Sequence, residues 1–301
     1  MSAYKKKTLL VLVGIPGSGK TTFRNKLVAE QGAVYTNKDD IRKLHSDVVK
    51  KMKRGDFEQM VHKEEMVNLA KLLDAGHDLV VYDNTNLSSK YITGVEAVAV
   101  KYGYTVEVHF MMDSMSVELC HRRNTGRPVA EHVPAYIVET MAEKFVGLWF
   151  NYQVKAKNLK IAKNDRKKAI IVDLDGTLAH MGNRGAFEWL RVGEDTVDEH
   201  VRDLVWFYHR KGWTVIACSG RDAVCREQTE KWMVDNKIPF DYLFMRPVDD
   251  MRKDVYIKLE IYLNDIMEHF DVQVCLDDRL QVVRAWRGIG LKCLQVQSGW
   301  F

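Results

Sequence analysis

The sequence predicts an α/β protein made of two doubly wound parallel-sheet domains. The chain has 301 residues, enough for two domains of ordinary size. Short apolar runs alternate with segments of helical character along both halves, as expected when parallel strands are joined by helices. Polar turns rich in Gly or Asp directly follow the apolar runs at 8–13 and 169–174. Each half is therefore expected to form its own sheet, with functional side chains at the ends of the strands.

In the first domain, expected at 1–150, the apolar runs are continuous and partly β-branched, which is typical of strands buried on both faces. We expect strands at 8–13, 34–36, 79–83 and 105–110. The segments between them predict a helix to about residue 31, a helix-rich stretch over 40–75, and helices at 88–102 and 114–123. A last helix is opened by Pro134 and is expected to end near Phe150.

The second domain is expected at 169–301. Its predicted strands lie at 169–174, 213–219, 242–245, 272–277 and 291–296, and its predicted helices at 197–211, 223–236, 253–268 and 279–288. In residues 179–196 the apolar residues follow neither the period of a helix nor that of a strand, and this segment is predicted to form a small cap. Residues 151–168 are rich in Lys and Arg with few large apolar residues, and predict a basic linker. This linker is either a solvated boundary or a surface that follows a phosphate backbone.

Composition sets broad limits on function. The net charge is +4, divided as +6 over 1–165 and −2 over 166–301. A mildly basic first half suits a polyanionic ligand but is also common among kinases. Three of the five cysteines, Cys218, Cys275 and Cys293, lie in apolar runs and predict buried free thiols. The apolar run near the N-terminus is too short for a signal peptide or a membrane span, so we expect a soluble, cytoplasmic protein.

Residues 14–21 read Gly-Ile-Pro-Gly-Ser-Gly-Lys-Thr and fit the phosphate-binding loop pattern, with a predicted strand before and a predicted helix after. The glycines let backbone N–H groups point inward, where they and the positive end of the helix bind phosphates. Lys20 places a cation on the transferring phosphate, and the Thr21 hydroxyl holds Mg²⁺. The expected ATP-binding residues here are Gly14, Pro16, Gly17, Ser18, Gly19, Lys20, Thr21 and Thr22.

A kinase also needs an acceptor site and a base. Asp39 or Asp40, after the second predicted strand, is placed to take a proton from the acceptor hydroxyl. Arg42 lies about one helical turn beyond Asp39 and is placed to hold an acceptor phosphate. The alternative is a plain helix N-terminus, where Asp is favoured without any chemistry. Asp83 ends a strand beside the nucleotide crevice and is placed to order a metal-bound water or an acceptor-site arginine.

A cluster of cations, Arg122, Arg123 and Arg127, lies at and just beyond the end of the last predicted helix before Pro134. Such a cluster can close over a triphosphate and neutralise the transition state. The alternative is a helix C-terminus that cations stabilise.

Residues 173–177 read Asp-Leu-Asp-Gly-Thr directly after an apolar strand. Asp173 is placed to attack phosphorus and form an aspartyl phosphate. Asp175 is placed to protonate the leaving oxygen and then to activate water. Ser219, at the end of another predicted strand, can bind phosphoryl oxygens through its hydroxyl and N–H groups. The alternative for each Asp is an ordinary loop residue.

Lys258 and Asp254 lie four residues apart, hence on one face of a predicted helix. Lys258 can neutralise the phosphoryl group while Asp254 holds it; the alternative is a surface ion pair. Asp277 and Asp278 end a further strand and can complete a magnesium site. The expected ligands of that site are Asp173, Asp175, Asp277 and Asp278.

These motifs resemble two known families. The second half resembles the haloacid dehalogenase-like phosphohydrolases, and the first half resembles adenylate-kinase-like P-loop kinases. Their order, over nearly the whole chain, resembles the phage-type bifunctional polynucleotide 5′-kinase/3′-phosphatases. The matching residues are Gly14–Thr22, Asp39–Arg42, Asp83–Asn86, Arg123–Arg127, Asp173–Leu178, Arg184, Ser219–Arg221, Arg252–Asp254, Lys258, Asp277–Arg279 through Arg287, and Gln295–Gly299.

The resemblance implies particular roles. Asp39 is implied as the general base, Arg42 as the ligand of the phosphate on the 3′ side of the acceptor, and Asp83 as a support of the acceptor site. Arg123 and Arg127 are implied as contacts of the donor phosphates. One extra residue precedes the Arg123 motif, so the catalytic arginine, for which we favour Arg127, stays open among Arg122, Arg123 and Arg127. Substrate-binding roles in the phosphatase are expected for Thr177, Arg184, Ser219, Gly220, Arg221 and Asp254.

The functional hypothesis is an enzyme that heals broken nucleic acid ends. It transfers the γ-phosphate of ATP to the 5′-hydroxyl of RNA or DNA and removes 3′-phosphate ends, with 2′,3′-cyclic phosphate as a further candidate substrate. Mg²⁺ is expected at both sites, a separate ligase as the next enzyme, and, from the resemblance, a phage origin and a tetramer. The alternatives are a metabolite or nucleoside kinase fused to a small-molecule phosphatase, and a nucleotide-gated binding module with silent sites.

Overall fold

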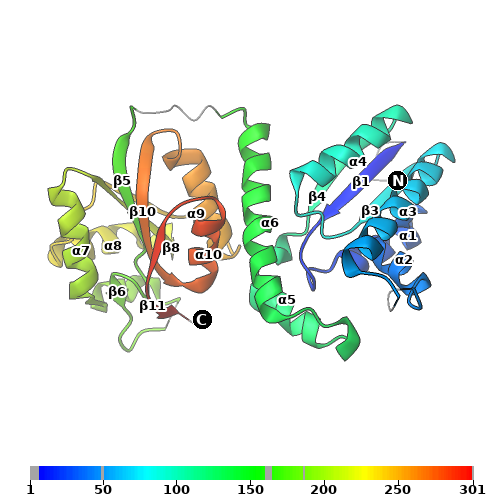
Figure 1. Ribbon diagram of the computed structural model, residues 1–301. Helices are drawn as coiled ribbons and strands as arrows, with labels where there is room; N and C mark the ends of the chain where they lie inside the picture. Colours follow the sequence, from blue (N-terminus) through cyan, green and yellow to red (C-terminus); the bar gives the residue numbers. More distant parts are fainter. Residues whose placement is uncertain (1–6, 49–50, 160–164, 186, 300–301) are drawn as a thin grey trace. The chain divides into compact units, whose positions relative to one another are not determined.

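The computed structural model describes residues 7–48, 51–159, 165–185 and 187–299. It divides into two compact units, Met1–Trp149 and Phe150–Phe301 (Figure 1). Helix α6 (Ala135–Ala156) runs further than the expected end near Phe150 and occupies the start of the segment expected to be a basic linker. Residues 160–164 of that segment lie outside the described part of the chain.

The first unit is built on a parallel sheet with strand order β2–β3–β1–β4. Its strands are β1 (Thr8–Val13), β2 (Val34–Thr36), β3 (Leu79–Asp83) and β4 (Thr105–Phe110), as predicted. Strand β1 lies between two neighbours, with Leu9 opposite Val80 of β3 and Val106 of β4, and every residue of it is buried. Its end, where the phosphate loop begins, is therefore fixed from both sides.

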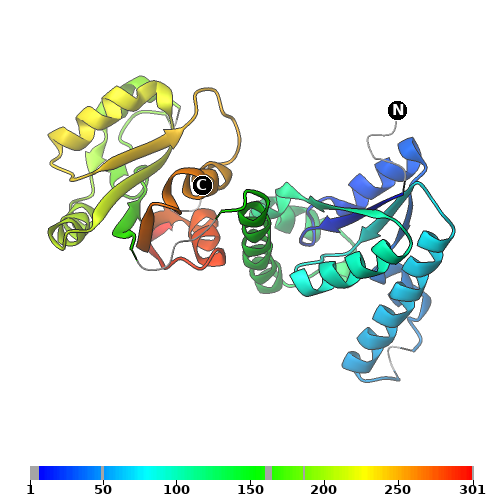
Figure 2. The same ribbon diagram turned by 90° about the horizontal axis from the view of Figure 1, so that it is seen from above.

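Helices cover both faces of this sheet (Figures 1 and 2). They are α1 (Lys20–Gln31), α2 (Lys38–Leu44), α3 (Arg54–Asp74), α4 (Ser89–Lys101) and α5 (Val117–Thr125), with the 3₁₀ turns η1 (Met112–Met115) and η2 (Val129–Glu131). The stretch predicted as helix-rich is thus two helices. Ile41 of α2 packs with Phe57 and Val61 of α3, so α2 is anchored by its apolar side.

The second unit is built on a parallel sheet with strand order β11–β10–β5–β8–β9. The strands are β5 (Lys167–Val172), β8 (Thr214–Asp222), β9 (Tyr242–Arg246), β10 (Phe270–Arg279) and β11 (Cys293–Gly299). Since β5 lies between β8 and β10, the polar residues that follow or end these three strands meet at one edge of the sheet.

The helices of this unit are α7 (Glu199–Arg210), α8 (Arg226–Asp235), α9 (Asp254–Ile261) and α10 (Leu280–Gly288), with the 3₁₀ turn η4 (Ala223–Cys225) and the π-helical turn η5 (Tyr262–Ile266). The expected cap holds more regular structure than predicted. Short strands β6 (Ala179–His180) and β7 (Thr196–Val197) pair antiparallel, and η3 (Trp189–Glu194) lies between them in sequence.

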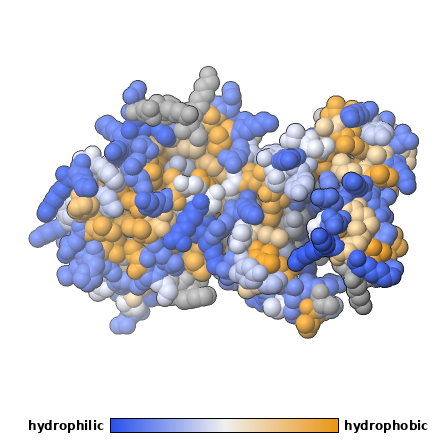
Figure 3. Space-filling model, viewed as in Figure 1, coloured by the Kyte–Doolittle hydropathy of each residue, from blue (hydrophilic) through white to orange (hydrophobic). Residues whose placement is uncertain are grey.

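The five cysteines are buried and free, which confirms the prediction for Cys218, Cys275 and Cys293. Within the described ranges, none of the helices combines the length and apolar character that crossing a membrane requires. Hydrophilic residues are spread over the visible face of both units, with hydrophobic areas among them (Figure 3).

Candidate active sites

The phosphate loop joins β1 to α1 and depends on its glycines. Gly17 and Gly19 have φ of +82° and +90°, the left-handed region that favours glycine. A Cβ on Gly17 would lie 2.3 Å from the carbonyl oxygen of Cys120. Gly19 caps α1 without a side-chain hydrogen bond, so the first N–H groups of this helix keep no side-chain partner at the cap. Thr21 and Thr22 are exposed in the first turn of α1.

Lys20 is held over this loop. Its Nζ donates to the carbonyl oxygens of Gly14 (2.9 Å) and Ile15 (3.0 Å). Burial lowers the pKa of Lys20 to about 8; nearby Asp83 opposes this shift and Arg127 adds to it. The buried Ser18 hydroxyl has no hydrogen-bond partner among the described residues. A cation, an unpartnered hydroxyl and an open helix N-terminus fit the phosphates of a nucleotide.

The arginine cluster approaches the same loop. Arg123 Nη1 donates to the carbonyl oxygen of Gly17 (3.3 Å) and to Asp113 Oδ2 (2.8 Å). Arg127 is close enough to lower the pKa of Lys20, whereas Arg122 is exposed. Asp113 was not predicted; it lies in η1, and no spacing in the sequence relates it to Arg123.

The structure separates the two candidate bases. Asn37 caps α2: its Oδ1 accepts from the Asp40 N–H (2.7 Å), and its Nδ2 donates to Asp40 Oδ2 (2.9 Å). Asp40 thus fits the alternative interpretation, in which an acidic residue stabilises a helix N-terminus and has no catalytic role. Asp39 has a side chain that is 81% exposed and pairs with Arg42 at 2.6 Å. Both residues are exposed, but the Asp40 carboxylate is bonded to Asn37, whereas the Asp39 carboxylate is paired with Arg42.

Arg42 also pairs with Glu58 of α3. Glu58 was not predicted from the sequence to be a site residue. Arg42 Nε donates to Glu58 Oε1 (3.0 Å) and Nη2 to Oε2 (2.7 Å), a forked pair. The hydrogen bond from Arg42 lowers the pKa of Glu58. The two residues lie on different helices, so no local sequence pattern predicts that they pair.

Asp83 pairs with an arginine from the phosphate-loop helix. Arg24 Nη1 donates to Asp83 Oδ2 at 2.9 Å, and its guanidinium lies 4.0 Å from the centroid of the Tyr35 ring. Burial raises the pKa of Asp83, while Lys20 and Arg24 lower it. Arg24, which was not predicted, links the phosphate loop to the end of β3.

In the second unit, a buried lysine lies among carboxylates. Lys258 Nζ is 2.8 Å from Asp173 Oδ1, 2.9 Å from Asp277 Oδ2 and 3.4 Å from Asp254 Oδ2. Burial alone would lower the pKa of Lys258, but the surrounding carboxylates raise it well above its ordinary value. Burial in turn raises the pKa of Asp173, although Lys258 opposes that shift.

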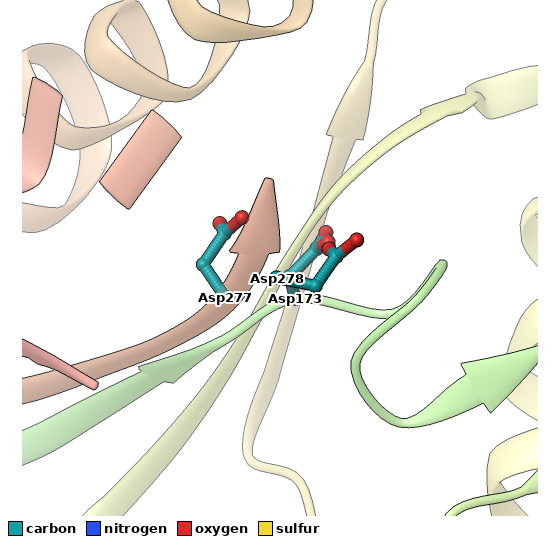
Figure 4. A group of neighbouring side chains, drawn as sticks. All are labelled: Asp173, Asp277 and Asp278. Atoms are coloured by element: carbon teal, nitrogen blue, oxygen red, sulfur yellow. The ribbon is translucent and has the colours of Figure 1, made fainter. Parts of the chain in front are cut away.

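Three of the predicted metal ligands converge. Asp173, Asp277 and Asp278 offer carboxylate oxygens that all lie within 4.8 Å of one another, from the ends of β5 and β10 (Figure 4). Oxygen-only ligands fit Mg²⁺. The Asp175 carboxylate, also predicted as a ligand, lies outside this group and faces the cap.

Two glycines bring the turns close to these carboxylates. Gly176 has φ of +82°, and a Cβ there would lie 2.3 Å from Asp278 Oδ2. A Cβ on Gly220 would lie 2.1 Å from Asp254 Oδ1. Thr177 donates to Asp278 Oδ1 at 3.3 Å. The buried Ser219 hydroxyl accepts from the N–H of Arg221 at 3.1 Å, so Ser219 also shapes its own turn.

Asp175 is held by two buried arginines. Arg221 donates through Nε (2.9 Å) and Nη2 (2.8 Å), and Arg184 donates through Nη2 (3.0 Å). Both arginines also pair with Asp195, at 2.6 Å each, and the Asp195 side chain is fully buried. Asp195, at the end of the cap, was not predicted. It connects the cap to the predicted acid–base residue.

Comparison with known proteins agrees with this geometry. Residues 167–301 match the family model described as the polynucleotide kinase PNKP phosphatase domain, and residues 9–148 match the model described as an AAA domain. The chain thus joins a P-loop domain to a haloacid dehalogenase-like domain, which confirms the predicted fold class. The second domain is thus similar to the phosphatase domains of polynucleotide kinases, and the pair of domains confirms the resemblance to the bifunctional polynucleotide kinase/phosphatases.

A relative from Autographa californica nuclear polyhedrosis virus, "Putative bifunctional polynucleotide kinase/RNA ligase", is 30% identical over 301 residues. The match covers 94% of this chain and 41% of the relative, so the chain spans less than half of that protein's length. Chains from two solved structures, described as the Pnkp1/Rnl/Hen1 RNA repair complex and the Pnkp1/Rnl/Hen1 complex, are 26% and 28% identical. They cover 100% of this chain and 99% of their own, with TM-scores of 0.44 and 0.45.

Proposed function

We propose that this chain heals nucleic acid ends. Its first unit transfers the γ-phosphate of ATP to a 5′-hydroxyl, and its second unit removes a 3′-phosphate. The observation that carries this proposal is the pairing of two sites in one chain. A phosphate loop lies in the same unit as the Asp39–Arg42 pair, and the Asp173–Lys258 pair lies in a domain of the polynucleotide kinase phosphatase family.

In the kinase unit, ATP supplies the phosphoryl group and Mg²⁺ the positive charge that balances it. The N–H groups of the loop and Lys20 hold the phosphates, and Thr21 offers its hydroxyl to the metal ion. Asp39 takes the proton of the attacking 5′-hydroxyl. Arg123, already bonded to the loop at Gly17, and Arg127, beside Lys20, hold the donor phosphates.

Arg42 is suited to hold the acceptor strand. A guanidinium has five N–H donors, and the described contacts with Asp39 and Glu58 use Nη1, Nε and Nη2 once each. Each Nη atom therefore keeps a second N–H for a phosphate oxygen. Because Glu58 fixes the plane of the guanidinium, those donors are oriented before the strand arrives.

In the phosphatase unit, Asp173 attacks the phosphorus of the 3′-phosphate, and the bond from phosphorus to the ribose oxygen breaks. Asp175 gives its proton to that oxygen, and then takes a proton from the water that hydrolyses the aspartyl phosphate. Lys258 neutralises negative charge on the phosphoryl group. Mg²⁺ held by Asp173, Asp277 and Asp278 would supply further positive charge.

The products, a 5′-phosphate and a 3′-hydroxyl, are the ends that a ligase joins, so we propose a separate ligase as the next enzyme. The viral relative is named as a putative bifunctional polynucleotide kinase/RNA ligase, which supports this order of reactions. Tetramer assembly, which the resemblance implies, stays a prediction.

The test uses a short RNA and a short DNA, each with a 5′-hydroxyl and a 3′-phosphate. Each is incubated with the protein, Mg²⁺ and γ-labelled ATP, and both ends are resolved by mass. Label gained at the 5′ end together with phosphate lost at the 3′ end supports the proposal, and the relative rates give the preferred polymer. If neither end changes while ATP or a small phosphomonoester is consumed, the metabolite-kinase alternative replaces it.

A further inference from the structure

The first unit contains a fully buried carboxylate that no motif includes. Glu65 lies in α3 with 0% of its surface exposed. Its Oε1 accepts from Asn84 Nδ2 at 2.6 Å, and its Oε2 accepts from the Tyr82 hydroxyl at 2.7 Å. Lys38 Nζ lies 4.0 Å from Oε2. A carboxylate is costly to bury unless both oxygens find partners, so Glu65 and its partners form a tightly specified set.

Asn84 connects Glu65 to helix α2 through two hydrogen bonds. While its Nδ2 donates to Glu65, its Oδ1 accepts from the backbone N–H of Lys38 at 3.1 Å. Lys38 is the first residue of α2, the helix that carries Asp39 and Arg42. Helix α2 has only 7 residues, and a helix this short has little stability of its own. Its position therefore depends on anchors such as Asn84.

The chemical identity of Glu65 decides which way the Asn84 amide points. A carboxylate only accepts hydrogen bonds, so the NH₂ group of Asn84 has to face it. The carbonyl oxygen of Asn84 is then left for the Lys38 N–H. An amide at position 65 would remove this selection, because it offers both a donor and an acceptor.

We propose that Glu65 is a positioning residue of the kinase site, which orients Asn84 and thereby sets where α2 presents Asp39 and Arg42. This inference rests on the kinase activity proposed above. It predicts that the contact chain from Glu65 through Asn84 to the Lys38 N–H affects the acceptor reaction and leaves the phosphate loop unaffected.

A swapped pair of variants tests the proposal. Glu65→Gln offers Asn84 either an NH₂ group or an oxygen, so the direction of the Asn84 amide is no longer fixed, and Asn84→Asp brings two carboxylates together. The double variant Glu65→Gln/Asn84→Asp restores an N–H···O bond in the reverse direction and keeps an acceptor for the Lys38 N–H. Steady-state kinase kinetics with a 5′-hydroxyl oligonucleotide are measured for all three, with the phosphatase activity of the same samples as internal control.

We expect each single variant to lower kcat/KM for the oligonucleotide about ten- to hundredfold, since small displacements of reacting groups have effects of this size. The KM for ATP should stay within about twofold, and the double variant should recover most of the loss. Tyr82→Phe is the matched control. It removes a hydrogen bond from the same carboxylate without touching Asn84, so it should lower the melting temperature but leave the oligonucleotide KM unchanged.

Amide hydrogen exchange of α2 decides the structural claim independently of activity. Both single variants should raise exchange at residues 38–41, and the double variant should restore protection. Unchanged exchange and unchanged acceptor kinetics in the single variants would overturn the inference. It would also be overturned if Tyr82→Phe and the double variant lost as much kcat/KM for the oligonucleotide as the single variants. If the wild-type protein shows no kinase activity, the proposed function fails, while the exchange result still decides the role of Glu65.

Discussion

Lys258 Nζ lies 2.8 Å from Asp173 Oδ1, although the two side chains are only 1% and 7% exposed. Asp254 and Asp277 also lie within 4.0 Å of the same ammonium group. One buried cation therefore faces three carboxylates, and they raise its pKa well above the ordinary value. The charged form of Lys258 is therefore favoured, and with three carboxylates around one ammonium group the site retains negative charge that suits a divalent cation.

Removing this cation should affect stability as well as catalysis. We expect Lys258→Met to abolish phosphatase activity and to destabilise the second unit by about 3–5 kcal/mol, because buried carboxylates lose their partner. Urea unfolding with excess Mg²⁺ should show a smaller loss than unfolding with a chelator. Lys231→Met, which removes an exposed pair with Asp235, is the matched control. Equal stability of the two variants would contradict this prediction.

The two sites should fail independently. Asp39→Asn should lower the kinase rate by about 10²–10⁴-fold through loss of the base, with the phosphatase rate unchanged. Asp173→Asn should abolish the phosphatase, because an amide cannot form the acyl phosphate, and spare the kinase. Both rates are measured on one preparation with a doubly reactive oligonucleotide. Loss of both activities in either single variant would show that the sites are coupled.

Asp195 should matter although it lies outside the Asp-x-Asp motif. Asp195→Asn removes the buried charge that pairs with Arg184 and Arg221, so we expect a loss of about 3 kcal/mol in unfolding free energy. The phosphatase kcat should also fall, because Arg184 and Arg221 lose the buried partner that orients them toward Asp175. Asp198→Asn is the control, since its amide oxygen can still cap α7 at Val201. A normal kcat in Asp195→Asn would count against this link.

ATP binding should weaken with rising pH. Lys20 in the free protein has a pKa of about 8, so it is charged below pH 8 and loses its proton above it. Bound phosphates favour the charged form, so binding above pH 8 takes up a proton and Kd rises by up to about tenfold per pH unit. Calorimetry in buffers of different ionisation enthalpy measures this uptake. A constant Kd between pH 7 and 9.5 would refute the assignment.

The strands of the first unit could be predicted to the residue, because each is a short apolar run with clear turn signals. The ends of the helices were less predictable: α6 continues to Ala156, beyond the expected end near Phe150. In the second unit, β8 and β10 extend beyond their predicted ends and include the polar residues of the site.

The residues that could not be predicted are partners of the predicted ones. Glu58 holds Arg42, Arg24 holds Asp83, and Asp195 holds both arginines at Asp175. A motif fixes spacing within one strand, turn or helix, whereas these partners come from a different element. Each has an ordinary sequence context, so only the packing of elements reveals it.

The placement of β5 beside β10 has a consequence for protein synthesis. The phosphatase nucleophile at Asp173 is made early in its unit, but its neighbours Lys258, Asp277 and Asp278 are made about 85 to 105 residues later. The residues assigned to the kinase are complete at Arg127. On the ribosome, the kinase unit can therefore fold first, while the phosphatase centre cannot be assembled until β10 has emerged and joined the sheet.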